Sequence, residues 1–171
     1  MNLEELSSKL PLITGWIDQT LAKHAANAQP VADFGFIRLP YFFPANLLAR
    51  TKVVTLVRVP VPPLTAMGLP GFSAFENGNY SGITYKDTYF LQVPQAANES
   101  KHFHELVHVV QWAHLGAERF LLTYATGLAA NGYEKNPIEV MAFELQDYFE
   151  RRGQPVDVET VVRNTLNERN P

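Results

Sequence analysis

The sequence predicts an α+β fold in which a small, mostly antiparallel sheet precedes a mainly helical C-terminal part. Residues 52–59 are rich in β-branched side chains, a composition typical of a buried strand. Two further strand-like runs within residues 83–91 flank Lys86 and Asp87 and predict a tight hairpin. From residue 98 onward, apolar side chains recur at helical spacing. The chain has 171 residues, enough for one domain with its own core, so we expect a single domain over residues 1–171.

Composition and charge narrow the class of protein. Apolar residues make up 46% of the chain and charged residues 18%, as in a globular protein rather than a disordered one. The net charge of −3 gives no reason to expect nucleic acid or an anionic membrane as a partner. The chain has no cysteine, so any metal site must use histidine and carboxylate ligands. The acidic start lacks a signal-peptide pattern and no apolar run is long enough to span a membrane, so we expect a cytoplasmic protein.

The N-terminal half is expected to combine one helical region with strands and loops. Residues 3–27 show an amphipathic pattern, in which Pro11 is expected to separate a short first helical piece from a longer second one. Strands and loops should occupy residues 34–92, and residues 34–39 have a strand-like composition. The aromatic residues at the start of this region are expected to fill the core, and residues 64–81 should form a long loop.

Helix start and stop residues divide the C-terminal half. A helix is expected from about residue 98 to residue 115, with Asn98 or Ser100 as its cap and Gly116 as its end. Further helices are expected between residues 118 and 167, because apolar side chains keep their helical spacing there.

A His-Glu-x-x-His pattern lies inside the first of these helices. His104 and His108 are four residues apart, which places them about 40° apart on the helical wheel. Two imidazoles one turn apart can bind the same metal ion. Glu105 borders that face, about 100° from His104 and about 60° from His108, so it can reach a metal-bound water without being a ligand. The pattern is typical of zinc hydrolysis, which needs nitrogen ligands and a carboxylate base.

Catalytic zinc is usually held by three protein ligands, so the pattern lacks one. The candidates are His114, Glu134, Glu139 and Glu144. His114 has the spacing of the metzincin pattern, but Gln111 occupies the position of the glycine that lets the chain leave the helix there. Glu139 lies near the start of a later helix that could cross the first one. Glu139 also completes a capping box that begins at Asn136, so the residues alone leave the third ligand open.

Three segments of the chain resemble one family. Residues 104–111, His-Glu-Leu-Val-His-Val-Val-Gln, resemble the H-E-L-T-H-V-V-Q segment of bacterial minimal gluzincins, which are regarded as zinc metallopeptidases. Residues 82–91 look like the strand pair that precedes that helix, and residues 136–142 are similar to the N-P-x-E-x-E-A signature. The resemblance implies a zincin-like fold, with the sheet packed on the active-site helix, and Glu139 as third zinc ligand. Met141 and Phe143 stand where the family has, or often has, acidic residues.

These patterns together predict a zinc-dependent hydrolase, most specifically a metallopeptidase acting on a peptide or protein substrate. His104, His108 and Glu139 would hold Zn²⁺, and Glu105 would act as the general base. The candidates for stabilising the oxyanion are Tyr133, Tyr124 and His102. The strand before the active-site helix could bind an extended peptide by edge pairing. The alternatives are a zinc hydrolase of small amides or esters and a non-catalytic binding or scaffold protein.

Overall fold

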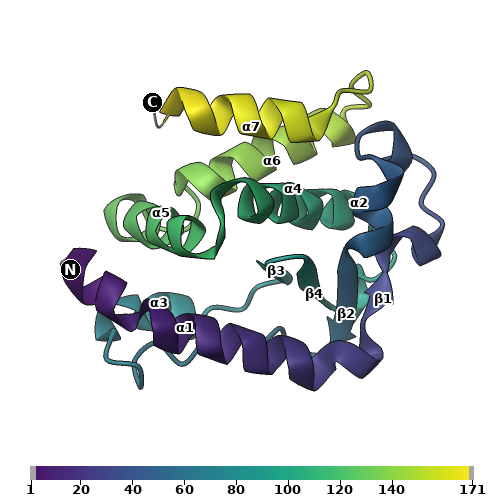
Figure 1. Cartoon of the computed structure of the whole chain (residues 1–171). Helices are drawn as coiled ribbons and strands as arrows, with labels where there is room; N and C mark the ends of the chain where they lie inside the picture. Colours follow the sequence, from purple (N-terminus) through teal and green to yellow (C-terminus); the bar gives the residue numbers. More distant parts are fainter. Residues whose placement is uncertain (1–2, 170–171) are drawn as a thin grey trace.

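The computed structural model describes residues 3–169 and has an α+β architecture, with seven α-helices and one four-stranded sheet in that range (Figure 1). In chain order, the α-helices and strands are α1 (Leu3–His24), β1 (Gln29–Pro30), α2 (Ala45–Arg50), β2 (Lys52–Leu56), α3 (Ser73–Glu76), β3 (Gly82–Tyr85), β4 (Thr88–Gln92), α4 (Glu99–Leu115), α5 (Ala117–Asn131), α6 (Pro137–Glu150) and α7 (Val158–Arg169). Short 3₁₀ helices cover Ala25–Asn27, Val31–Phe34, Leu39–Tyr41, Pro70–Phe72 and Val93–Gln95.

The sheet is mixed, with the strand order β1-β2-β4-β3. Its outer pairs are antiparallel, but the central strands β2 and β4 are parallel, with Val54 opposite Phe90. The expectation of a mostly antiparallel sheet therefore holds for two of the three strand pairs but not for the central one. A parallel pair needs a crossover of a dozen residues or more. The long segment between β2 and β4, which includes α3 and β3, provides it.

The predicted hairpin is confirmed, and it decides which residues of β3 face which helix. Lys86 adopts a left-handed conformation with φ 59° in the turn between β3 and β4. Successive side chains of a strand point to opposite faces. Tyr85 therefore packs on Trp16 of α1, whereas the Thr84 side chain reaches Glu105 of α4. The sheet lies between α1 and α4 (Figure 1).

The structure corrects the expected break at Pro11, because α1 runs through it as one helix. Proline inside a helix removes one hydrogen bond and costs about 3 kcal/mol. α1 offsets this cost by burying an apolar stripe on the sheet and on α5. The stripe consists of Leu6, Leu10, Ile13 and Ile17.

Residues 34–39 do not form the strand that their composition predicts. Gly35 adopts a left-handed conformation with φ 66°, which ends the preceding 3₁₀ helix and turns the chain. The Glu99 carboxylate then accepts hydrogen bonds from the backbone N–H groups of Arg38 and Leu39, at 2.7 and 3.1 Å. These donors are satisfied by a side chain of α4, so the segment has no need of a sheet partner.

The phenylalanines of the same region pack in or against the core, as predicted, whereas Tyr41 is exposed. Phe42 and Phe43 are buried, and both rings contact Phe103 on α4. Phe42 also contacts Phe149 near the end of α6. This cluster fixes α4 and α6 relative to each other at the end remote from the N-terminus of α6.

α4 is the central helix of the molecule, and its predicted bounds are confirmed. Asn98 caps its start by accepting a hydrogen bond from Lys101 N at 3.4 Å, and Gly116 ends it with φ 74°. The helix packs on β3, α5, α6 and α7, and every side chain from His102 to Trp112 is buried. Among the described residues, no helix combines the length and the apolar character that crossing a bilayer requires.

Candidate metal centre

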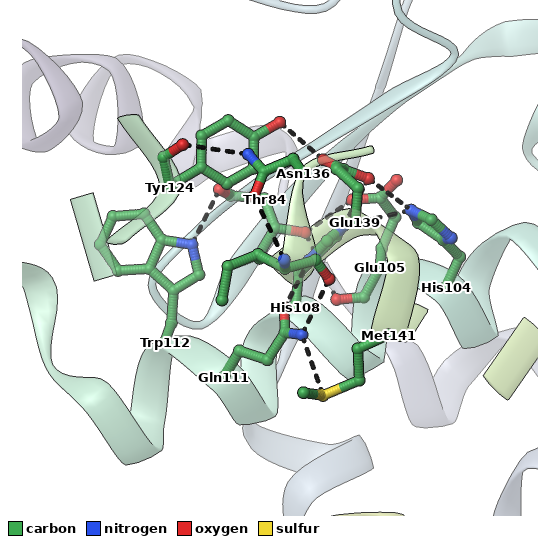
Figure 2. Close-up of polar contacts among 11 residues, drawn as sticks. Thr84, His104, Glu105, His108, Gln111, Trp112, Tyr124, Asn136, Glu139 and Met141 are labelled. Carbon is green, nitrogen blue, oxygen red and sulfur yellow. Dashed lines mark hydrogen bonds and ion pairs between the residues drawn. The ribbon is translucent and has the colours of Figure 1, made fainter. Parts of the chain in front are cut away.

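Three buried side chains from two helices meet beside the sheet (Figure 2). α4 presents His104 and His108 from adjacent turns, and α6 brings Glu139 from its first turn. The Nε2 atoms of the two histidines are 3.1 Å apart. Glu139 Oε2 lies 3.4 Å from each of them. The structure therefore brings together the three residues predicted as metal ligands.

The donor atoms have the spacing that a tetrahedral metal ion requires. Ligands about 2.0–2.2 Å from a tetrahedral ion lie about 3.3–3.6 Å from one another, close to the three distances observed. Glu139 Oε2 is also buried without a hydrogen-bond partner among the described residues. Its polar neighbours are the two imidazole Nε2 atoms at 3.4 Å, and a cation shared by the three groups would satisfy this buried oxygen. The cluster of His104, His108 and Glu139 could thus hold a metal ion.

The other candidates for the third ligand lie elsewhere. His114 is exposed, and its Nε2 contacts Asn167 Oδ1 at 3.0 Å. Because α4 remains helical through Gln111, His114 points away from the two other histidines, and the metzincin arrangement does not form. Glu134 and Glu144 are also exposed on the surface.

Glu139 is aimed at the histidines by Tyr124, and it does not act as the reciprocal partner in a capping box. Asn136 caps α6 by accepting a hydrogen bond from Ile138 N at 3.2 Å, as the sequence predicts. Glu139 Oε1 instead accepts a hydrogen bond from the Tyr124 hydroxyl at 2.6 Å. Holding one oxygen in this way leaves Oε2 as the atom that faces the two imidazoles.

The junction of α5 and α6 sets the position of Glu139. The Asn136 side-chain amide donates to the Tyr124 carbonyl oxygen at 3.0 Å, so the residue that caps α6 also ties it to α5. A Cβ on Gly127 would lie 2.5 Å from Asn136 Oδ1, so only glycine allows this approach without a shift. Both contacts hold the first turn of α6 over the face of α4 that carries the histidines (Figure 2).

Gln111 fixes the tautomer of His108. Its Nε2 donates to the Ile138 carbonyl oxygen at 3.1 Å and contacts Met141 Sδ at 3.4 Å. Its Oε1 therefore accepts from His108 Nδ1–H, at 2.7 Å, and directs His108 Nε2 to the cluster. The neutral amide of Gln111 thus accepts the imidazole N–H, a role that a carboxylate often has next to a metal-binding histidine.

We expect Gln111→Ala to weaken zinc binding by about 10- to 100-fold, the usual effect of losing such an outer hydrogen bond. Gln146→Ala is the matched control, because Gln146 is also buried but bonds Ser100 and Glu150, away from the cluster. Competition with a zinc-chelating indicator gives both affinities. Equal affinities in the two variants would rule out this role for Gln111.

Within the part of the chain that the structure describes, His104 lacks a hydrogen bond like the one between Gln111 and His108. Its Nδ1 atom is buried without a hydrogen-bond partner among residues 3–169. The apolar Phe143 ring of α6 packs on the His104 ring, with the ring centroids 4.7 Å apart. One histidine of the cluster is therefore held by an amide and the other by packing.

The charges of the cluster are strongly coupled. Burial acts to raise the pKa of the Glu139 carboxyl, but His108 and His104 outweigh it and hold that pKa well below its usual range. Burial acts to lower the pKa of His108, but the Glu139 carboxylate outweighs it and raises the pKa of His108 to about 9. Without a metal ion, His108 therefore carries a proton at neutral pH, and a bound cation must displace that proton.

Zinc affinity is accordingly expected to rise by about tenfold per pH unit up to about pH 9 and to level off above it. The sign follows from competition, because each zinc ion bound below that pH releases the proton of His108. Indicator competition at a series of pH values, corrected for the titration of the indicator, measures the slope. An affinity that does not change between neutral pH and pH 9 would contradict this coupling.

Glu105 lies beside the cluster and outside it (Figure 2). Its Oε2 accepts a hydrogen bond from Thr84 Oγ1 at 2.6 Å, and its Oε1 packs so closely on β3 that a Cβ on Gly82 would lie 2.2 Å away. Gly82 and Thr84 lie on the same face of β3, and together they position the Glu105 carboxylate. The base predicted from the sequence is therefore held by the sheet and not by the three candidate ligands.

No family model matches the chain, and neither the curated proteins nor the solved structures compared with it give a match. The likeness of residues 104–111 and 136–142 to gluzincin motifs stays a hypothesis. The functional argument comes from the geometry of the site.

The three candidates for stabilising an oxyanion have different surroundings. His102 lies on another face of α4, where its ring nitrogens contact the Tyr89 hydroxyl at 2.6 Å and the Ala96 carbonyl oxygen at 3.0 Å. His102 is thus a core residue, and naming it as a candidate was wrong. The Tyr124 hydroxyl already donates to Glu139. Tyr133 lines the cavity beside the cluster, and so does Tyr80, which the sequence did not single out.

Two cavities adjoin at the cluster. The inner one, of about 100 Å³, lies among α1, α4, α5 and the loop before β3 and is lined mainly by apolar side chains. The outer one, of about 180 Å³, includes the polar residues Asn79, Ser81 and Lys101 in its lining. Both are lined by Tyr80, Gly82, His104, Glu105 and Tyr133. The cluster of candidate ligands therefore borders both a polar cavity and an apolar one.

Proposed function

We propose that the chain is a zinc-dependent hydrolase, and most specifically a metallopeptidase with gluzincin-like ligands in a zincin-like fold. The observation that carries the proposal is the position of Glu105. It is buried beside the three candidate ligands, takes no part in their cluster and is held by Thr84. A purely structural metal site has no use for an additional carboxylate there, whereas hydrolysis needs a base next to the attacking water.

The candidate ligands and Glu105 have separate roles in the proposed hydrolysis. His104, His108 and Glu139 would hold a zinc ion, which would lower the pKa of a bound water and polarise the substrate carbonyl. Glu105 takes the proton of the water and passes it to the leaving amine. The hydrogen bond from Thr84 occupies Glu105 Oε2, which leaves Oε1 as the atom that accepts the proton.

Tyr133 and Tyr80 are the donors best placed to bind the oxyanion. Burial and the charge of Glu139 raise the pKa of Tyr80 to about 12 and raise that of Tyr133 further. Both hydroxyls therefore stay protonated and able to donate at neutral pH. The two rings contact each other, with centroids 5.1 Å apart, so they form one wall of the site.

A peptide is the substrate that best suits the surroundings of the cluster. β3 is an edge strand, and β-strand edges bind extended peptides through backbone hydrogen bonds. The Trp112 indole N–H already donates to the Thr84 carbonyl oxygen at 3.1 Å, so pairing would be confined to the Gly82 end of the strand. That end lies next to Glu105, where the scissile bond must lie.

The second candidate is a metal-binding protein without turnover. The buried, unpaired Nδ1 of His104 favours it, because the outer hydrogen bonds of metal-binding histidines tune both affinity and activity. The two candidates differ in one measurable property, which is hydrolysis.

The test is cleavage of a proteome-derived peptide mixture by zinc-loaded protein, with new termini identified by mass spectrometry. We expect cleavage that stops on chelation and returns when zinc is added. Metal-loaded protein that leaves the mixture intact under varied conditions would favour the non-catalytic candidate.

Gly82→Ala should abolish hydrolysis while leaving zinc affinity nearly unchanged. The new Cβ would lie 2.2 Å from Glu105 Oε1 and displace the base, and the atoms nearest to it belong to Glu105 and Leu91 rather than to the three candidate ligands. Gly15→Ala is the control, because a Cβ at Gly15 of α1 meets nothing within 4 Å and alanine favours a helix. Cleavage by Gly82→Ala at the parental rate would contradict the claim that β3 positions the Glu105 carboxylate.

A further inference from the structure

The apolar inner cavity is unusual for the interior of a small domain. Protein interiors are close-packed, and empty spaces much larger than a water molecule are few. This space nevertheless lies between α1 and α5, two helices that also pack on each other. Its walls include Ile13, Ile17, Phe72 and Leu121, and also His108 and Glu139 of the candidate metal centre. A cavity that is apolar on most sides and open to the reactive groups at one end is typical of a substrate pocket.

The size of the cavity limits what it can hold. A dry cavity of about 150 Å³ with similar walls takes up one benzene molecule. At about 100 Å³, the inner cavity is smaller than that, so its size suits one branched aliphatic side chain better than a long acyl chain. The polar atoms of a peptide main chain would instead lie in the outer cavity, beside Asn79, Ser81 and Lys101.

We propose that the inner cavity is the specificity pocket of the enzyme, and that it selects peptides with a leucine-sized aliphatic side chain next to the scissile bond. This inference rests on the proposed zinc-hydrolase function, because the candidate metal ligands and Glu105 form part of the lining of the pocket. It names the substrate class that the metal centre alone leaves open.

Ala125 is the wall residue best suited to test the pocket. It is half-buried on α5, lines the inner cavity and has a short side chain that leaves space in front of it. Ala125→Leu would fill that space with a side chain of the size expected for the substrate. Ala129→Leu is the matched control, because Ala129 lies one turn further along α5, is exposed and does not line the cavity.

Binding of metal-chelating hydroxamates tests the pocket without requiring turnover. Glycine hydroxamate and leucine hydroxamate differ only in the side chain, and octanohydroxamate carries a linear acyl chain. On the zinc-loaded parental protein, leucine hydroxamate should bind about tenfold or more tighter than glycine hydroxamate. Octanohydroxamate should bind no tighter than leucine hydroxamate. Ala125→Leu should remove the preference for leucine hydroxamate, and Ala129→Leu should keep it.

The outcomes separate the pocket from the function on which it rests. Equal binding of glycine and leucine hydroxamates would overturn the pocket alone, and clearly tighter binding of octanohydroxamate would assign it to an acyl chain. If no hydroxamate bound zinc-loaded protein, the proposed function would fail and the pocket with it. The comparison of the three ligands on the parental chain stands even if Ala125→Leu does not fold.

Discussion

Glu105→Gln is expected to keep its fold and one zinc equivalent per chain but to hydrolyse peptides at least about 10²-fold more slowly. Glutamine has nearly the same shape as glutamate, and its amide oxygen can still accept the hydrogen bond from Thr84. The three candidate ligands are unchanged, so only the ability to take a proton is lost. The effect should appear in kcat, because a base acts in the transition state rather than in binding.

The measurement compares single-turnover cleavage by the parental chain and the variant at equal zinc content. Glu144→Gln serves as the control, since Glu144 is exposed on α6 and lies outside the cluster. If Glu105→Gln cleaved at the parental rate, Glu105 would not be the base and the mechanism would need another.

Glu139→Ala should lose zinc affinity by well over the 10- to 100-fold that an outer hydrogen bond accounts for, because it removes a ligand. His114→Ala should keep the affinity of the parental chain, since His114 is exposed and bonded to Asn167. A mere capping role for Glu139 would instead predict a loss of stability of about 1 kcal/mol with zinc binding intact. The structure already assigns the cap of α6 to Asn136.

Zinc titrations of both variants, with melting curves of the metal-free proteins, separate these readings. Retained affinity in Glu139→Ala would remove Glu139 from the metal site. Lost affinity in His114→Ala would require a rearrangement of α4 beyond Gln111.

The local features of the site could be predicted from the sequence because each depends on a few neighbouring residues. The spacing of His104 and His108 fixes their common face as soon as the segment is helical. The cap and the end of α4 likewise follow from Asn98 and Gly116, whose conformational preferences are local. The hairpin of β3 and β4 was predictable for the same reason, although Lys86 is not a favoured residue for its turn.

The features that failed depend on contacts between distant segments. Pro11 was expected to break α1, but the burial of its apolar stripe outweighs the local cost. Residues 34–39 were expected to pair as a strand, but Glu99 of α4 takes up two of their N–H groups. The parallel pairing of β2 and β4 also has no local signature.

The residues that hold the side chains of the site in place show the same contrast between local patterns and contacts of distant segments. Gly82 and Thr84 could have been predicted as neighbours of Glu105 if the alternation of the hairpin had been combined with its packing on α4. Gln111, three residues after His108, was within reach of a helical wheel. Tyr80 could not be foreseen, because it comes from a loop whose path is set by the whole fold.

The central claim is that zinc binds to His104, His108 and Glu139, and anomalous scattering at the zinc edge from crystals of protein purified without chelator tests it most directly. We expect one peak per chain, about 2.0–2.2 Å from Nε2 of both histidines and from Oε2 of Glu139. Glu105 should lie beside the peak without contacting it. The absence of a peak in zinc-soaked crystals, or a peak held by other residues such as His114, would contradict the account.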